Sequence, residues 1–235
     1  MSKEPSEEEM ISSVFKEVYA LRKNWRIYCE VFGTSKERVD EFNSACAEVS
    51  VAFEKALFEK IVMQISRLTD PAKGRKSDMV NVSLYSVIDE AKSRGQMNKT
   101  LWERWHEVQR LAAPLRNHRD KYLAHNDKEF GARLTEIAGS ARKEIEDLIC
   151  AMCELFAELG ILLKDTTYAT NPLVGSFEIQ KFFLILSLGN KAWDEKFKED
   201  AKARVTPATF KGLWYEDTEY EPLRRSIKRR SDGII

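Results

Sequence analysis

An all-α fold, arranged as an antiparallel helical bundle, is predicted by three features of the sequence. Apolar residues recur in steps of three and four along most of the first 164 residues, which is the spacing of one helix face. No segment alternates apolar and polar residues for long, as a half-buried β-strand would. Glycine and proline interrupt the pattern between the apolar segments, as expected for the turns that join antiparallel helices.

Two long helices are predicted before residue 67. Ser6 and Glu9 have the spacing of a capping box, which marks a helix start. The apolar stripe behind them consists of Ile11, Val14, Val18, Leu21, Trp25, Tyr28 and Phe32. Gly33 ends this helix, and the threonine or serine directly after it caps the next one. The second helix is expected to reach about Ser66, with a stripe of Val39, Phe42, Cys46, Val49, Phe53 and Ala56.

A loop and a short helix come next. The stretch RLTDPAKGRKSDMVN, residues 67–81, contains Pro71 and Gly74 and has no apolar period, so we predict a loop. The short helix that follows is closed by Gly95, and its apolar side consists of Leu84, Val87, Ile88 and Ala91.

Two further helices complete the predicted bundle. The fourth starts near Thr100, and Pro114 predicts a kink or a break near Ala113. Its stripe consists of Leu101, Trp105, Val108, Leu111, Leu115, His118, Tyr122 and His125. The fifth follows Gly131, and its stripe consists of Leu134, Ile137, Ala141, Ile145, Leu148, Met152, Leu155 and Leu159.

The apolar pattern weakens after Lys164, so we divide the chain into a helical bundle at residues 1–164 and a C-terminal extension at 165–235. DTTYATNPLVGS has the composition of a linker. FEIQKFFLILSLGNKAW is predicted to form one more helix that docks on the bundle. The last thirty residues, which include the basic RRSIKRR, are expected to be loosely ordered.

Composition limits the possible functions. The chain of 235 residues carries 38 basic and 38 acidic side chains, so a global basic surface for nucleic acid is absent and any anion must be bound by a local cluster. The acidic start, MSKEPSEEEM, does not resemble a signal peptide, and FFLILSL is too short to span a bilayer. We therefore expect a cytoplasmic protein without membrane contact.

Four cysteines raise the question of redox or zinc chemistry. Cys29 and Cys46 fall on apolar helical positions, where buried free cysteines are common. Cys150 and Cys153 form a C-x-x-C, but no second such pair and no histidine lies nearby, and the surrounding LICAMCELF is apolar. Packing in the core is therefore the preferred interpretation, and neither a metal nor a cofactor is expected.

The stretch LRNHRDKYLAHND, residues 115–127, holds two of the three histidines. His118 and His125 are seven residues apart, roughly 10.5 Å along a helix, so one helix cannot place both on one metal, whose bonds to nitrogen are about 2 Å. His118 replaces a leucine of the stripe and is expected to be a core residue. His125 lies near the helix end and is the candidate functional histidine.

The charged residues of this stretch permit two interpretations. Arg116 and Asp120 have the spacing of an ion pair within the helix, and a solvated face is the simpler interpretation. Arg119 lies about 120° around a regular helix from His125, so the two converge only if the last turn unwinds or two copies of the helix meet. An arginine fork suits phosphate, and a histidine moves protons near neutral pH. Together they suffice to cut RNA, whose 2′-hydroxyl supplies the nucleophile that DNA lacks.

The sequence RDKYLAH, residues 119–125, resembles the R-x(4–6)-H motif of HEPN-domain proteins, in which a polar residue such as Asp120 usually follows the arginine. ISRLTDPAKG at residues 65–74 and NVSL at residues 81–84 resemble the abortive-infection (Abi) U-type branch of these proteins. The resemblance covers roughly residues 10–162. A tyrosine two positions after the histidine, which some toxin branches carry, is replaced here by Asp127.

This resemblance implies a dimer in which two motif helices face each other and both protomers line one cleft. Many such proteins are metal-independent endoribonucleases of phage-defence or toxin–antitoxin systems, so the implied partners are a second copy, RNA, and an antitoxin or second defence protein. Arg119 and His125 are the expected catalytic residues. The expected supporting residues are Asp120, Arg116, Asn126, Arg67 and Asp70.

A non-catalytic alternative remains open. HEPN-like proteins without activity exist, and the same cleft would then bind a partner protein or a nucleotide. The zero net charge favours this alternative, because tight RNA binding usually draws on several phosphate contacts. The crowded motif favours catalysis.

Overall fold

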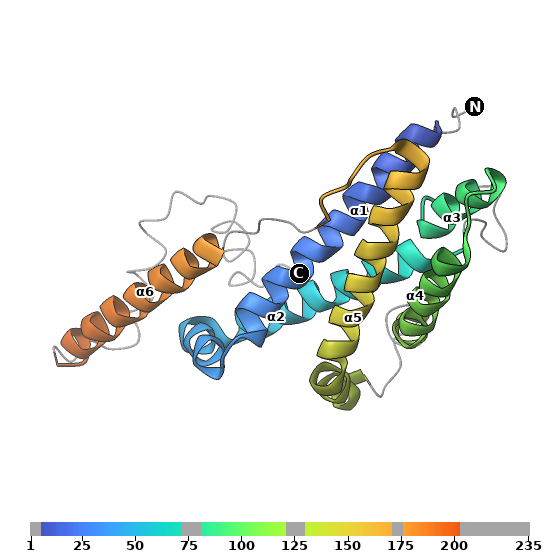
Figure 1. Ribbon diagram of the computed structural model, residues 1–235. Helices are drawn as coiled ribbons and strands as arrows, with labels where there is room; N and C mark the ends of the chain where they lie inside the picture. The colour runs from blue at the N-terminus through green and yellow to red at the C-terminus, as the bar shows by residue number, and fades with distance from the viewer. Residues whose placement is uncertain (1–5, 72–80, 121–129, 171–175, 203–235) are drawn as a thin grey trace, which may run out of the picture. The chain divides into compact units, whose positions relative to one another are not determined.

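A computed structural model describes residues 6–71, 81–120, 130–170 and 176–202, with the backbone alone at residues 130–141, 176 and 199–202. These residues form helices and no strand, which confirms the all-α prediction (Figure 1). The helices are α1 (Glu7–Tyr28), α2 (Lys36–Thr69), α3 (Leu84–Ser93), α4 (Lys99–His118), α5 (Phe130–Lys164) and α6 (Ser176–Lys202), and a π-helical turn, η1 (Cys29–Gly33), follows α1.

Helix α1 begins and packs as the sequence predicts. The Ser6 hydroxyl accepts a hydrogen bond from the Glu9 backbone at 3.3 Å, and the Glu9 carboxylate accepts one from the Ser6 backbone at 2.7 Å. This is the predicted capping box. All members of the predicted stripe are buried, from Ile11 to Phe32. Ser35 caps α2, accepting from the Arg38 backbone.

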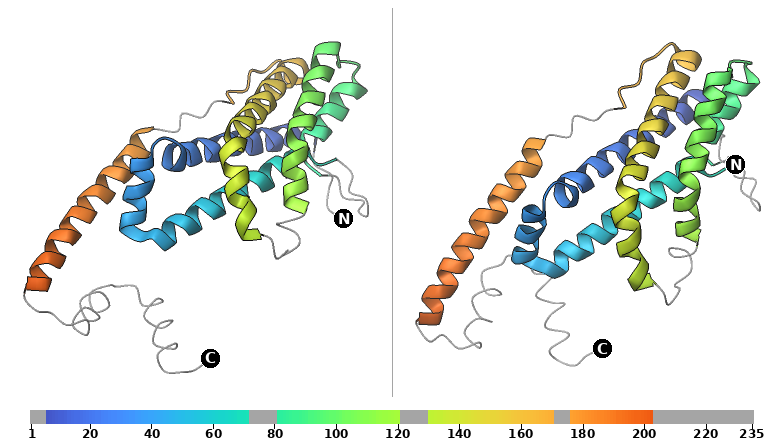
Figure 2. Two further views of the ribbon diagram at one scale, coloured as in Figure 1. Left: turned by 90° about the horizontal axis from the view of Figure 1, so that it is seen from below. Right: turned by 60° about the horizontal axis from the view of Figure 1, so that its bottom comes forward.

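Neighbouring helices run antiparallel, as the bundle prediction requires. Along α1 and α2, Asn24 donates to Gln64, whereas the earlier Glu17 pairs with the later Arg67. Along α1 and α5, the Phe15 ring stacks near Phe156, whereas Arg22 pairs with Glu146. Helix α1 contacts both α2 and α5, and Figure 2 gives two further views of these helices.

The predicted stripe in the first half of α2 is wrong. Phe42 is buried, but Cys46, Val49, Phe53 and Ala56 are exposed, Val49 by 54%. The cause lies at Cys46, whose non-helical φ and ψ of −164° and 90° kink the helix and change which side faces the bundle. Beyond the kink a new stripe is buried, consisting of Leu57, Phe58, Ile61, Val62, Ile65 and Leu68.

Helix α2 also continues to Thr69, so the first residues of the predicted loop are helical. Asp70 is its C-cap, with extended φ and ψ of −72° and 147°. The chain therefore leaves the helix between Thr69 and Pro71, and the side chain of Asp70 is placed by the end of a helix. This matters for the site described below.

Helices α3 and α4 form an antiparallel hairpin around Gly95. The φ of Gly95, +64°, is a left-handed value that favours glycine, as expected after a helix end. Helix α4 runs through Pro114 to His118, so a break is wrong as a prediction, while a kink near Ala113 stays a prediction. Pro114 lies on the exposed side, where the ring costs one backbone hydrogen bond without disturbing the buried stripe.

The described part of α5 matches its predicted stripe, since Ile145, Leu148, Met152, Leu155 and Leu159 are buried. The side chains of the predicted Leu134, Ile137 and Ala141 lie outside the described residues.

The chain divides into two units, Met1–Phe183 and Leu184–Ile235, with the boundary inside α6. Helix α5 ends at Lys164, where the sequence predicts the bundle to end. The start of α6 belongs to the first unit and packs on α2 there: the Phe182 ring lies 5.6 Å from that of Phe42, and Phe183 lies under Arg38. The division of the chain into a helical bundle at residues 1–164 and a C-terminal extension at 165–235 stays a prediction. Within the described residues, none of the helices has the length and apolar character needed to cross a membrane.

Candidate functional site

The ends of α2 and α4 meet at Arg119, the C-cap of α4. Its Nη1 donates to Asp70 Oδ2 at 2.5 Å and its Nε donates to Asp120 Oδ1 at 2.8 Å. Its Nη2 lies 2.8 Å from the same Asp120 oxygen in an ion pair. The Arg119 side chain is 20% exposed and that of Asp70 is 26% exposed, so this ion pair is partly shielded from water. Two predicted site residues that are 49 positions apart, Asp70 and Arg119, are thereby brought together.

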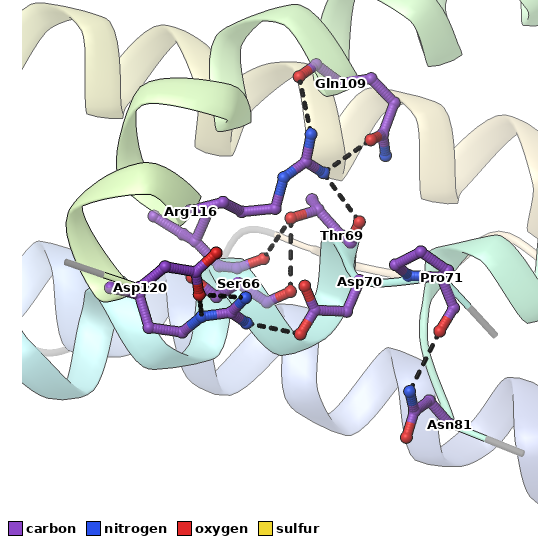
Figure 3. Close-up of polar contacts among 10 residues, drawn as sticks. Ser66, Thr69, Asp70, Pro71, Asn81, Gln109, Arg116 and Asp120 are labelled. Carbon is purple, nitrogen blue, oxygen red and sulfur yellow. Dashed lines mark hydrogen bonds and ion pairs between the residues drawn. The ribbon is translucent and has the colours of Figure 1, made fainter. Parts of the chain in front are cut away.

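Arg116 lies one turn before Arg119 on α4 and binds Thr69, the residue that precedes Asp70. Its Nη1 donates to the Thr69 carbonyl at 2.8 Å and to Gln109 Oε1 at 2.6 Å (Figure 3). A longer bond of 3.4 Å joins its Nη2 to the Gln109 carbonyl. The predicted ion pair between Arg116 and Asp120 is therefore wrong, because Asp120 binds Arg119 and the fork of Arg116 is directed at α2 and at its own helix.

Gln109 was not a predicted site residue. Its Oε1 accepts from Arg116 and also, at 3.4 Å, from the Tyr85 hydroxyl of α3. Gln109 precedes Arg116 by seven residues, so both lie on one face of α4, and this spacing is the signal that could have indicated a contact. The sequence gives no reason to choose Gln109 over the other polar residues on that face.

Side-chain bonds also fix the chain on both sides of the segment after α2. The Thr69 hydroxyl donates to the Ile65 carbonyl at 2.8 Å within the last turn of α2. The Asn81 amide donates to the Pro71 carbonyl at 3.0 Å, and the Ser86 hydroxyl donates to the Asn81 carbonyl at 2.6 Å. Figure 3 shows Pro71 and Asn81 facing each other across this bond. The residues that flank 72–80 are thus held together next to Asp70.

The charges of this cluster balance. Arg116 and Arg119 are cations, Asp70 and Asp120 are anions, and their formal sum is zero. Burial disfavours the charge of Arg119, but the hydrogen bonds to Asp70 and Asp120 outweigh this and raise the pKa of its guanidinium. A guanidinium has five N–H donors, and within the described residues two of those of Arg119 are hydrogen-bonded to carboxylates.

His118 is a core residue, as the sequence predicts. Only 7% of its surface is exposed. Burial lowers the pKa of His118, and the nearby Glu59 carboxylate offsets this effect in part. The folded protein therefore favours the neutral imidazole.

We expect His118→Ala to reduce the free energy of unfolding by about 1–3 kcal/mol, the typical cost of removing a buried polar group and leaving its surroundings unsatisfied. Because the pKa of His118 is lower when folded, its contribution to stability is lost as the pH falls below about 6.5. Urea unfolding at pH 5 and pH 7 measures both effects, and the variant should lose less stability between these values than the parent. An equal loss in both proteins would contradict the assignment.

The remaining predicted residues are distributed as follows. Arg67 lies on α2 and pairs with Glu17 of α1 at 3.5 Å, so the structure does not bring it to Arg119. His125 and Asn126 lie outside the described residues, and so does Tyr122. Of the two expected catalytic residues, Arg119 is therefore among the described residues and His125 is not.

The cysteines fit a structural role, with one exception. Cys153 is buried, and burial raises the pKa of its thiol to about 11. Burial likewise raises the pKa of Cys150, and a hydrogen bond to Glu146 adds to this. Because the thiolate is the reactive form, both cysteines are poorly suited to redox chemistry. The expectation that Cys46 is buried is wrong, since it lies exposed at the kink of α2.

Comparison with known proteins places the chain in a family. Searches of curated proteins and of solved structures gave no match to it. A scan of protein families matched residues 6–182 to HEPN_AbiU2, described as AbiU2, and this match extends past the resemblance in the sequence into α6. Because the match covers three quarters of the chain and includes α1 to α5 with the Arg119 cluster, the protein belongs to the AbiU2 family of HEPN proteins.

Proposed function

We propose that the protein is a metal-independent endoribonuclease of an abortive-infection or toxin-type system, with its active site shared between two copies of the chain. The observation that carries the proposal is the arrangement of Arg119. Its guanidinium is held by carboxylates from two directions at the end of α4, and the match to the AbiU2 family supports a module of the abortive-infection or ribonuclease type.

The proposed reaction uses RNA as its own nucleophile. The 2′-hydroxyl oxygen attacks the adjacent phosphorus, and the bond from phosphorus to the 5′-oxygen breaks. A base takes the 2′-hydroxyl proton, an acid gives a proton to the leaving 5′-oxygen, and the products are a 2′,3′-cyclic phosphate and a 5′-hydroxyl. His125 carries one of these proton transfers. Arg119 stabilises the charge that develops on the non-bridging oxygens.

The fixed orientation of Arg119 supports this role. A long side chain normally loses rotamer freedom when it binds a ligand, and here the bonds to Asp70 and Asp120 have already removed much of that freedom. Hydrogen-bond donors that are already oriented stabilise a transition state without reorganisation during the reaction. In the proposed reaction, other N–H groups of the same planar guanidinium bind a pair of phosphate oxygens.

The test is digestion of total cellular RNA by the purified protein in excess EDTA, with His125→Ala as the comparison. We expect cleavage by the parent and its loss in the variant. Arg110→Gln is a suitable control, because Arg110 lies on α4 but bonds to Glu107 at the surface. Cleavage that disappears with EDTA, or that persists in His125→Ala, would contradict the proposal.

A shared site makes a separate prediction for mixtures of variants. If Arg119 of one copy acts with His125 of the other, then a mixed dimer of Arg119→Lys and His125→Ala chains has one intact pair. Random mixing at equal amounts should restore about a quarter of the parent activity, since half of the dimers are mixed and each has one of two sites. Mixing the chains after denaturation and refolding, with light scattering to check for dimers, measures this. No recovery would place both groups in one chain.

A non-catalytic role is the second candidate, and one observation favours it. The cluster of Arg116, Arg119, Asp70 and Asp120 has no formal charge, so its attraction for RNA over a distance is weak. In that role the same surface binds a protein partner, such as an antitoxin or a second defence protein. A growth-arrest or phage-defence phenotype that is unchanged in both Arg119→Lys and His125→Ala would favour this candidate.

A further inference from the structure

We propose that Arg116 and Gln109 are positioning residues for Arg119, acting through the end of α2 and without contact to RNA. The inference rests on the proposed function for its catalytic part. Its structural part, the control of the Arg119 side chain by Gln109, stands on hydrogen bonds between described residues and is testable without RNA.

The first step is the end of α2. The last carbonyl groups of a helix have no partner in the helix itself and must be satisfied by other groups. Arg116 satisfies the carbonyl of Thr69, the last residue of α2, at 2.8 Å. A cationic side chain at this end is also favoured by the helix dipole. Arg116 thereby fixes the point at which the chain leaves α2.

The second step leads from this point to Arg119. Asp70 follows Thr69 directly, and its carboxylate lies 2.5 Å from Arg119 Nη1. Two arginines that are three residues apart on α4 therefore hold two consecutive residues at the end of α2. If Arg116 releases Thr69, Asp70 is free to move, and among the described residues Arg119 keeps the exposed Asp120 as its partner.

The third step identifies Gln109 as the support of Arg116. The shortest hydrogen bond of the Arg116 guanidinium within the described residues joins it to Gln109 Oε1 at 2.6 Å. The Tyr85 hydroxyl of α3 donates to the same oxygen at 3.4 Å. Gln109 is neutral, so any effect of its replacement on catalysis cannot be the loss of a phosphate-binding charge. This property separates positioning from direct binding.

Two substitutions and two controls make the kinetic test. Gln109→Met keeps the length of the side chain and removes the acceptor, and Arg116→Met removes the whole connection. Arg110→Gln changes a charge on the same helix, and Asn117→Met adds an apolar side chain at an exposed position of α4. We expect both test variants to reduce kcat by about 10- to 100-fold, as small displacements of a catalytic group do, with KM changed by less than about threefold. The controls should retain parent activity.

A second readout follows Arg119 directly. The Nη1–H of Arg119 donates to Asp70 in a partly shielded ion pair, so its signal in a nitrogen-15 NMR spectrum should be protected from exchange with water. Arg119→Lys identifies the signal by its absence. We expect Gln109→Met to abolish the protected signal while leaving the melting temperature and the helical circular dichroism close to those of the parent. Arg110→Gln should leave the signal in place.

The outcomes separate the inference from the proposed function. Loss of the protected signal in the test variants together with a fall in kcat supports the inference. If the parent protein does not cut RNA, the proposed function fails, but loss of the signal in the test variants still supports the structural part of the inference. An unchanged Arg119 signal in both test variants overturns it whatever the activity. A lost signal with unchanged kcat, or a rise in KM without a fall in kcat, also overturns it, because Arg116 would then have no positioning role in catalysis.

Discussion

Arg119→Lys is expected to reduce RNA cleavage by about 100- to 1,000-fold, the usual cost of removing one donor that stabilises a transition-state oxyanion. Lysine keeps the charge, so the expected loss comes from geometry. The arginine has five donors, of which Asp70 and Asp120 accept two in hydrogen bonds, whereas an ammonium has three donors in all. His125→Ala should cause a loss of similar size, since general acid–base catalysis contributes about 10²- to 10⁴-fold.

The control for Arg119→Lys is Arg110→Lys on the same helix. Arg110 is exposed and pairs with Glu107, so this change should leave cleavage within about twofold of the parent. Single-turnover rates on a short RNA, measured with enzyme in excess, separate chemistry from binding. If Arg119→Lys retained more than about a third of the parent rate, charge alone would suffice and the proposed fork would have no role.

Asp70→Asn is expected to slow cleavage by about 10- to 100-fold, because it removes the charged partner that fixes Arg119 from the side of α2. Asparagine has the size of aspartate, so packing at the end of α2 is retained. Asp120, which is 62% exposed, then becomes the main restraint on the guanidinium. The rate should be measured under the same single-turnover conditions, together with the melting temperature.

The matched control is Asp89→Asn, because Asp89 pairs with Lys92 on the exposed side of α3. The opposite result for Asp70→Asn is also informative. If cleavage became faster, Asp70 would compete with the phosphate for Arg119 instead of orienting it, and the positioning account would be wrong.

The helices that follow a single apolar period could be predicted from the sequence. In α1 every member of the predicted stripe is buried, because the helix has a defined cap and runs without interruption to η1. The stripe of α2 could not be predicted in the same way. Its residues keep the spacing of three and four, but the kink at Cys46 changes which side of the helix meets the bundle, and nothing in the local sequence marks that position.

The candidate site shows a similar limit. The motif and its resemblance to a family selected Arg119, Asp120 and Asp70, which the structure brings together, and their role in catalysis stays a prediction. The partners of Arg116 could not be inferred, because one is a backbone carbonyl of Thr69, which has no signature in the pattern of side chains. The sequence spacing indicated Asp120 as the partner of Arg116, and this was incorrect. Arg116 binds the Thr69 carbonyl of α2 and Gln109 of its own helix, and Asp120 binds Arg119.

The central claim is that the chain cuts RNA through the 2′-hydroxyl with Arg119 and His125. The most direct measurement maps a cleavage position in EDTA and then compares the natural RNA with a copy that carries a single 2′-deoxy nucleotide on the 5′ side of that bond. We predict products that end in a 2′,3′-cyclic phosphate and a 5′-hydroxyl, and no cleavage of the deoxy copy at that position. Products ending in a 3′-hydroxyl, or equal cleavage of both substrates, would contradict the claim.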